Sequence, residues 1–192
     1  NKKNLDSYHF GFILGPCLNA SGRLDTAKKA MDLLECEDEK YAEVLAEALK
    51  KLNDERKDLT EKGTKEAIEK AEQLDDSVLV IYLEHCHESI AGIIAGRVRE
   101  KYNKPTIVLT DAVEGVKGSG RSIEEYDMYA ELTKVKELFT KFGGHKMAAG
   151  VSLPKENIGT LRKKLNENCN LTQEDLYLKV WIDMQLPLEY VT

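Results

Sequence analysis

Apolar positions recur every three or four residues over one long stretch of the chain and then give way to short, dense runs. Over residues 38–74, apolar side chains such as Tyr41, Leu52 and Leu74 are spaced among mostly charged positions, which predicts one long amphipathic helix. Such a helix would be roughly 55 Å long at 1.5 Å per residue. Gly63 is the one glycine in this stretch, and its low helix propensity lowers the stability of the helix there. A narrow apolar stripe with an acidic exterior is typical of a connector between domains.

From residue 77 onward, apolar runs alternate with helical periodicity. The runs predict strands at 78–83, 106–110, 116–121, 147–153 and 177–182. The periodicity between them predicts helices at 89–101, 126–140 and 154–168, and a short helix is expected earlier, at 25–34. Because strands and helices alternate, the sequence predicts an α/β fold preceded by the long connector helix.

The composition of the 192 residues, 42% hydrophobic and 32% charged, is that of a globular protein. No apolar run is long enough to span a bilayer. The four cysteines lack paired or zinc-knuckle spacing, which favours reduced thiols in a cytoplasmic protein. The net charge of −6 does not exclude a nucleic-acid partner, because the acidic excess lies in residues 28–76 and residues 77–192 are nearly neutral.

Three short runs place glycine or small polar residues beside groups that bind phosphate: His-Glu-Ser at 87–89, Gly-Ser-Gly-Arg-Ser at 118–122, and Gly-Gly-His-Lys-Met-Ala-Ala-Gly at 143–150. Glycines let the backbone approach an anion and turn N–H groups toward it. Arg121 offers a planar fork of donors, and His145 is a donor that gains charge near neutral pH. The three runs together predict a phosphate-lined site for a nucleic acid or nucleotide.

Each run also has a purely structural explanation. His87 is expected either to cap the helix that follows it or to face a phosphate at that helix N-terminus. The run at 118–122 is also compatible with a glycine-rich turn, the glycines at 143–144 with a helix stop, and residues 19–23 with a capped turn.

Other kinds of site find less support in the sequence. The run Glu-His-Cys-His-Glu at 84–88 invites a metal site but lacks the three or four converging ligands that zinc or manganese needs. The sequence shows no hydrolase nucleophile signature and no Walker or dinucleotide fingerprint.

Five motifs together resemble the RecJ family, the bacterial single-stranded-DNA-specific exonucleases of the DHH/DHHA1 phosphoesterase superfamily. They are Gly-Pro-x-Leu-Asn-Ala-x-Gly-Arg at 15–23, Leu-Asn-x-x-Arg at 52–56, His-Glu-x-Ile-x-Gly-Ile-x-Ala-Gly-Arg at 87–97, Gly-Ser-x-Arg-Ser at 118–122 and Gly-Gly-His-x-Met-Ala-Ala-Gly at 143–150. The resemblance covers nearly all of the chain. Two residues depart from the pattern, since Cys86 stands where an aromatic is frequent and Ser89 where glycine is common.

The resemblance implies a fold and a layout. The fold is a DHHA1-type mixed β-sheet flanked by helices. Residues 1–36 would end a DHH catalytic domain, 37–74 would form the connector helix, 75–170 the DHHA1 substrate-binding domain, and 171–192 a last strand and the lead into a following domain. In the family, manganese or magnesium is held by upstream aspartates and an Asp-His-His motif. Because no Asp-His pair occurs in this sequence, the segment is expected to hold no metal and no catalytic residue, and to be inactive alone.

The resemblance further implies the function and the substrate contacts. The intact protein would be a 5′→3′ single-stranded-DNA exonuclease of DNA repair and recombination, with the upstream DHH domain and a single-strand-binding protein or helicase as partners and no membrane association. The residues expected to contact the strand are Asn19, Arg23, His87, Gly118, Ser119, Gly120, Arg121, Ser122, Gly143, Gly144 and His145. Two alternatives stay open: a DHH/DHHA1 phosphodiesterase of short RNA, cyclic dinucleotides or phosphoadenosine phosphate, and a non-catalytic nucleic-acid-binding scaffold.

Overall fold

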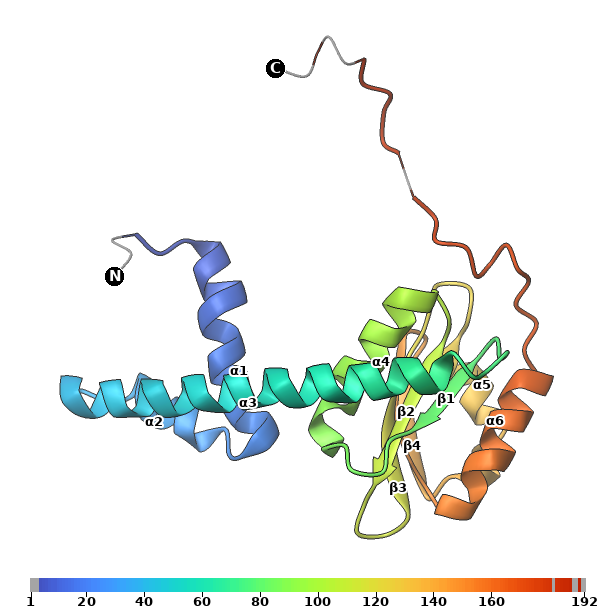
Figure 1. Ribbon diagram of the computed structural model, residues 1–192, viewed down its shortest axis with the longest axis horizontal. Helices are drawn as coiled ribbons and strands as arrows, with labels where there is room; N and C mark the ends of the chain where they lie inside the picture. The colour runs from blue at the N-terminus through green and yellow to red at the C-terminus, as the bar shows by residue number, and fades with distance from the viewer. Residues whose placement is uncertain (1–3, 181, 188–189, 191–192) are drawn as a thin grey trace.

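A helical N-terminal part and an α/β part are joined by one long helix in the computed structural model, which describes residues 4–180, 182–187 and 190 (Figure 1). A π-helix, η1 (His9–Leu14), runs into α1 (Gly15–Leu24), and α2 (Lys28–Leu34) follows. The long helix is α3 (Glu39–Ala71), 33 residues in length. It passes along α1 and α2 with its first half and along the sheet domain with its second.

The long helix confirms the expected connector and gives Gly63 a role that its helix propensity does not suggest. Asp38 caps α3 by accepting a hydrogen bond from the Tyr41 N–H at 2.8 Å. A Cβ atom on Gly63 would lie 2.6 Å from the Cδ1 atom of the buried Ile94. Gly63 therefore allows the close approach of α3 to the helix that carries Ile94.

A five-stranded sheet has the order β1-β2-β3-β5-β4. Its strands are β1 (Leu79–Tyr82), β2 (Thr106–Asp111), β3 (Val116–Arg121), β4 (Lys141–His145) and β5 (Ala148–Leu153). β1 and β2 are parallel and are connected by α4 (Glu88–Tyr102), whereas the other neighbours are antiparallel. The expected mixed sheet flanked by helices is confirmed.

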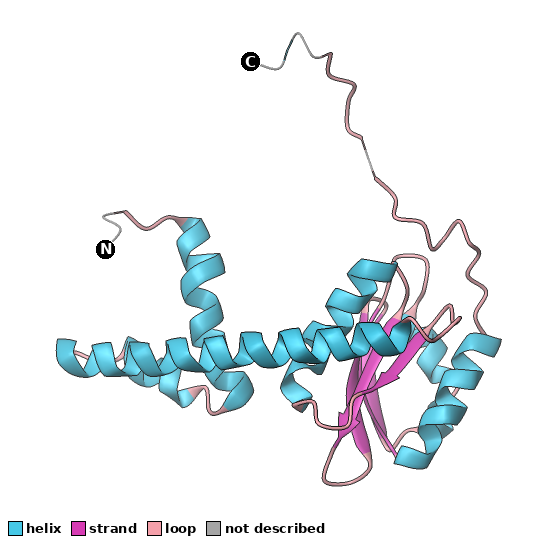
Figure 2. Ribbon diagram, in the orientation of Figure 1, coloured by secondary structure: helices cyan, strands magenta, loops and turns pink. Residues whose placement is uncertain are grey.

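The two faces of the sheet are covered to different extents (Figure 2). On one face, residues of all five strands pack with α5 (Met128–Thr133) and α6 (Ile158–Glu167) in a single apolar cluster. On the other face, α3 and α4 bury β1 and β2 in a second cluster. Beyond Ser119 and Arg121, this second face of β3, β5 and β4 presents exposed residues such as Lys117, Gly150 and His145. One half of one sheet face is thus open to a ligand.

The structure differs from the sequence predictions in several segments, including the helices at 9–24 and the edge strand β4, which were not predicted. The expected helix at 126–140 is only α5 followed by a 3-10 turn, η2 (Lys136–Leu138), because the chain must enter the edge strand β4. The expected helix at 154–168 begins as a 3-10 turn, η3 (Lys155–Asn157), before α6. The expected strand at 177–182 is wrong for its described residues, which pair with no strand, and Trp181 lies outside the described residues.

Candidate nucleic-acid interface

The N-terminus of α4 is held by two hydrogen-bonding side chains. His87 caps the helix, with Nδ1 accepting from the Ser89 N–H at 3.3 Å and lying 2.7 Å from Ser89 Oγ. The buried Thr110 of β2 donates from Oγ1 to the carbonyl oxygen of Cys86 at 2.5 Å. The cap and this tether fix the first turn of a 15-residue helix, whose N-terminus attracts anions.

Arginines from three helices gather beside this turn. Arg23 of α1 donates from Nη1 to the carbonyl oxygen of Ser89 at 2.9 Å. Arg56 of α3 donates from Nε and Nη2 to Oδ1 of Asn53, at 3.3 and 3.0 Å. Burial, followed by the positive charges of Arg23 and Arg97, lowers the pKa of Arg56. The pKa of Arg56 thus responds to arginines of both α1 and α4.

The four arginines around this turn and on the adjoining strand are not neutralised by ion pairs within the described residues. Over the described part of the chain, Arg23, Arg56, Arg97 and Arg121 form no ion pair with a carboxylate, whereas Arg99 pairs with Glu100 and Arg162 with Asp76. A cavity of about 200 Å³ opens between these helices. Its lining residues are Pro16, Asn19, Arg23, Arg56 and Ile93. In a chain of net charge −6, unpaired guanidinium groups around a cavity form a local anion-attracting site.

The open sheet face adds a second group of side chains. Ser119 and Arg121 point from β3 toward α4, where a Cβ atom on Gly92 would lie 2.8 Å from Arg121 Nη2 and 3.3 Å from Ser119 Oγ. Burial, followed by the charges of Arg23 and Arg99, lowers the pKa of Arg121. His145 lies at the end of β4, exposed, and its Nδ1 accepts from the Met147 N–H at 3.3 Å. Arg121 therefore lies close enough to Arg23 and Arg99 for their charges to act on it.

Several of the predicted residues are tightly packed within the fold. A Cβ atom on Gly118 would lie 2.2 Å from the Val108 carbonyl oxygen, and one on Gly120 would lie 2.9 Å from Met128 Sδ. A Cβ atom on Gly144 would lie 2.3 Å from the Ala148 carbonyl oxygen. Ser122 is buried and donates its hydroxyl to the Tyr126 carbonyl oxygen at 2.7 Å, so its side chain does not reach the open face.

The sequence predictions therefore divide into groups. The structure gathers Asn19, Arg23 and His87 around the start of α4, and Ser119, Arg121, Gly143 and His145 on the open sheet face. Arg56 and Arg97 were not among the predicted contacts, although both lie in motifs quoted above. The sequence feature that could have identified both residues is the arginine at the end of each motif.

The described residues contain no group of three or more His, Cys, Asp or Glu side chains able to hold a metal ion. Burial, with a smaller contribution from Glu66, raises the pKa of Cys86 to about 11, so its thiol is a poor nucleophile at neutral pH. Among the same residues, no helix is both long and apolar enough to cross a membrane.

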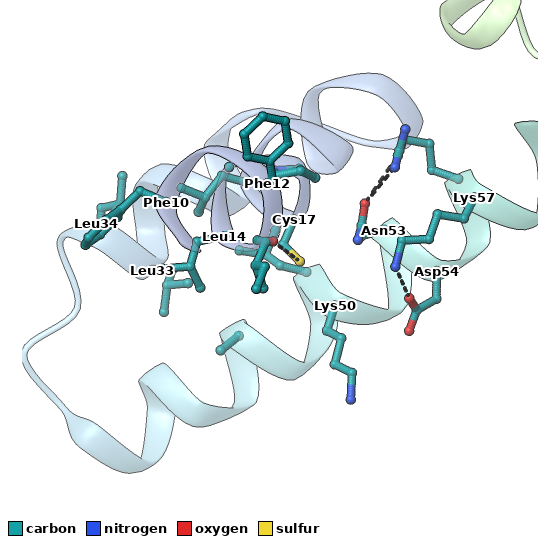
Figure 3. Close-up of a pocket in the computed structure, with 17 residues that line it drawn as sticks. Phe10, Phe12, Leu14, Cys17, Leu33, Leu34, Lys50, Asn53, Asp54 and Lys57 are labelled. Atoms are coloured by element: carbon teal, nitrogen blue, oxygen red, sulfur yellow. Dashed lines mark hydrogen bonds and ion pairs between the residues drawn. The ribbon is translucent and has the colours of Figure 1, made fainter. Parts of the chain in front are cut away.

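An apolar hollow of about 790 Å³ lies next to the arginine-lined cavity, with which it shares Pro16 and Arg56, between η1, α1, α2 and the first half of α3 (Figure 3). Phe10, Phe12 and Leu14 line one side and Leu33 and Leu34 another. Phe12 is 72% exposed and Leu34 is 67% exposed. Contiguous exposed apolar side chains of this kind are typical of surfaces that contact another protein element.

Comparison with known proteins agrees with this arrangement. Residues 75–171, which include the whole sheet, match the family described as DHHA1 domain. The chain belongs to the DHHA1 family. Its DHHA1 region contains α4 and the open sheet face, while Arg23 and Arg56 come from the helices that precede it.

The similarity to curated relatives extends beyond the DHHA1 region. The chain is 38% identical over 188 residues to the single-stranded-DNA-specific exonuclease RecJ of Bacillus subtilis, covering 95% of this chain and 24% of that protein. It is 37% identical over 176 residues to RecJ of Escherichia coli, covering 86% and 30%. The crystal structure of RecJ in complex with Mn²⁺ from Thermus thermophilus matches with a TM-score of 0.76 at 26% identity, covering 83% and 24%. The chain thus spans about a quarter to a third of the length of these curated relatives.

Proposed function

We propose that this chain is the strand-gripping segment of a RecJ-like 5′→3′ single-stranded-DNA exonuclease acting in DNA repair and recombination. One observation carries the proposal: Arg23, Arg56 and Arg121, which have no carboxylate partner among the described residues, lie around the start of α4 and the open DHHA1 face. The charge of Arg97 adds to theirs at Arg56. A phosphodiester backbone supplies the missing negative charge, and a guanidinium fork matches two phosphate oxygens. The similarity to proteins named single-stranded-DNA-specific exonucleases supports the same substrate.

In this proposal, binding and cleavage are divided between this chain and the rest of the protein. Manganese or magnesium is present in the solved RecJ structures, and in this proposal metal-assisted hydrolysis belongs to residues outside this chain. Asn19, Arg23, Arg56 and Arg97 hold the phosphate nearest the cut, and Ser119, Arg121, Gly143 and His145 hold the neighbouring nucleotides. The glycines at 118, 120 and 144 contribute close backbone packing.

The apolar hollow supports the proposed domain layout. Residues 1–36 complete the preceding DHH domain, which covers Phe10, Phe12 and Leu34, and residues 37–74 connect it to the DHHA1 domain at 75–170. Residues 171–192 lead into a following domain. We place the protein in the cytoplasm, with a single-strand-binding protein or a helicase as partners of the intact enzyme.

Fluorescence anisotropy of the 192-residue chain with a labelled thymidine oligonucleotide tests the proposal. We expect salt-sensitive binding that persists in EDTA, weaker binding of duplex of the same length, and no cleavage with manganese. The double variant Arg23→Ala/Arg121→Ala should weaken the affinity by more than about tenfold, because two phosphate contacts are lost. The matched control is Lys163→Ala, on an exposed site of α6. Wild-type chain that binds no single strand, or a double variant that binds as the wild type does, would overturn the proposal.

A further inference from the structure

The open half of the sheet presents its side chains in three rows that cross β3, β5 and β4. The strand registers set Lys117 opposite Ser152 and Ser152 opposite Lys141. The second row is Ser119, Gly150 and Gly143, and the third row is Arg121, Ala148 and His145. All nine residues point away from the face covered by α5 and α6, because side chains alternate along each strand and Val116, Val151 and Phe142 point into that cluster.

The middle row, which we call the bare row, carries almost no side-chain atoms, because two of its three residues are glycines. A Cβ atom on Gly150 or Gly143 would meet no atom within 4 Å, so neither glycine is required by packing. Both residues are exposed. This distinguishes them from Gly118 and Gly144, whose Cβ atoms would collide with backbone oxygens. Since glycine lowers strand stability, two unforced glycines paired across β4 and β5 point to a requirement outside the fold.

The two outer rows carry positive charge. Lys141 forms no ion pair among the described residues, and Lys117 pairs only with Glu88, at 3.1 Å. This pair borders a hollow of about 350 Å³ whose other lining includes Ser89, Gly150 and Ser152. Lys117 and Arg121 are four positions apart on β3, which corresponds to about 13 Å. The bare row therefore lies between basic residues on both sides.

We propose that single-stranded nucleic acid lies across β5 and β4 on this bare row, up to the edge of α4 at Ser119, with Lys117 and Lys141 contacting its phosphates from one side and Arg121 and His145 from the other. Strand side chains stand perpendicular to the sheet, so only glycine lets a flat base or sugar reach the backbone here. In this path, the absence of a side chain at Gly150 makes room for the nucleic acid, and Lys141 adds a contact to one of its phosphates. This inference rests on the proposed function and specifies the path of its substrate.

Substitutions that add volume without removing charge test the path. Gly150→Val should lower the affinity of the 192-residue chain for a thymidine oligonucleotide by at least about tenfold, and Gly150→Ala by less, because the added side chain occupies the base position. Both variants should fold, since valine is favoured over glycine in strands and nothing lies within 4 Å of that Cβ. Gly159→Ala is the matched control, because Gly159 is equally open but lies in α6.

Removal of one charge gives an independent measurement. Lys141→Gln should reduce the slope of log affinity against log salt by about 0.7, the value for one phosphate contact on a single strand. Lys163→Gln on α6 should leave the slope unchanged.

The outcomes separate this inference from the proposed function. If Arg121→Ala weakens binding while folded Gly150→Val and Lys141→Gln bind as the wild type does, the strand takes another path and the bare row serves a different contact, such as a protein segment. If the wild-type chain binds no single strand, the proposed function fails first. Graded loss at Gly150 together with the smaller slope for Lys141→Gln supports the path.

Discussion

Arg23 donates a hydrogen bond to the carbonyl oxygen of Ser89 at 2.9 Å, joining residues 66 positions apart in the chain. The bond ties α1 to the first turn of α4, and the same guanidinium contributes to the lowered pKa values of Arg56 and Arg121. The candidate interface is therefore assembled by tertiary contact between the helical part and the sheet domain. Disturbing that contact should affect binding without altering the sheet.

Replacement of Arg23 tests its two roles separately. Arg23→Lys keeps the charge but loses the planar fork, so the affinity for single-stranded DNA should fall several-fold while the salt slope is kept. Arg23→Gln should also reduce that slope by about 0.7. Anisotropy titrations between roughly 50 and 200 mM salt, the range in which such contacts are measured, distinguish the two variants. A Gln variant with the wild-type slope would show that Arg23 contacts no phosphate.

Gly92 is the position where one methyl group should disturb the site. In Gly92→Ala, the new Cβ atom would lie 2.8 Å from Arg121 Nη2, so the guanidinium must move and the affinity should fall several-fold with no change in charge. Gly96→Ala is the matched control in the same helix, because its Cβ meets nothing within 4 Å. Alanine should stabilise α4 there by about 0.5–1 kcal/mol. Equal DNA affinity of the two variants would contradict the role assigned to Gly92.

Alanine substitutions in the two predicted glycine runs should differ in their effect on the free energy of unfolding. Gly118→Ala should lower the free energy of unfolding by about 1–3 kcal/mol, because its Cβ would lie 2.2 Å from a backbone oxygen of the neighbouring strand. Gly143→Ala, at an open position, should change it by less than about 0.5 kcal/mol. Urea denaturation measures both values. Similar losses at the two positions would mean that Gly143 is also a packing residue.

The pH dependence of stability should reveal a cluster at the end of β1 and β2. The Tyr82 hydroxyl donates to Asp111 Oδ1 at 2.6 Å, and Lys155 Nζ lies 3.1 Å from the same oxygen. These contacts lower the pKa of Asp111 below its ordinary 3.8, with the Tyr82 hydrogen bond as the largest cause. A lowered folded-state pKa stabilises the fold above the unfolded value and loses this effect as the pH falls through the folded value.

Tyr82→Phe should therefore lower Tm near neutral pH, and the difference from the wild type should shrink as the pH falls below about 4. At the alkaline end, burial is the main cause that raises the Tyr82 pKa above 10, so the folded state keeps this hydroxyl protonated and the stabilisation is lost only as the pH rises past that value. Thermal melts of the two proteins from acid to neutral pH provide the measurement. A Tm difference independent of pH would show that the hydroxyl does not perturb Asp111.

Periodicity predicted the elements whose signals are local. The stripe from Tyr41 to Leu74 gave α3, and the β-branched run at 106–110 gave β2. The edge strand β4 was not predicted, because Lys141 to His145 holds two glycines and one apolar residue and is a strand only through pairing with β5. The run at 177–182 has the composition of a strand but no partner among the described residues.

The site was predictable where a motif carried its chemistry and not where its shape depends on tertiary contacts. Arg121 and His145 followed from their glycine neighbours. The convergence of Arg23, Arg56 and Arg97 depends on three helices meeting, and no local pattern reports that. The opposite roles of Gly118 and Gly143 likewise depend on which sheet face each one occupies.

A single uninterrupted helix links the apolar hollow to the sheet domain. At 33 residues, α3 is about 50 Å long, and Arg56 on this helix lines both the apolar hollow and the cavity beside α4. A protein element that covers Phe10 and Phe12 would therefore be held at a set distance and angle from the open sheet face, because α3 is continuous from Glu39 to Ala71. Lengthening or shortening this helix by one residue would rotate the two surfaces by about 100° relative to each other. The length of α3 thus sets the alignment of the two surfaces.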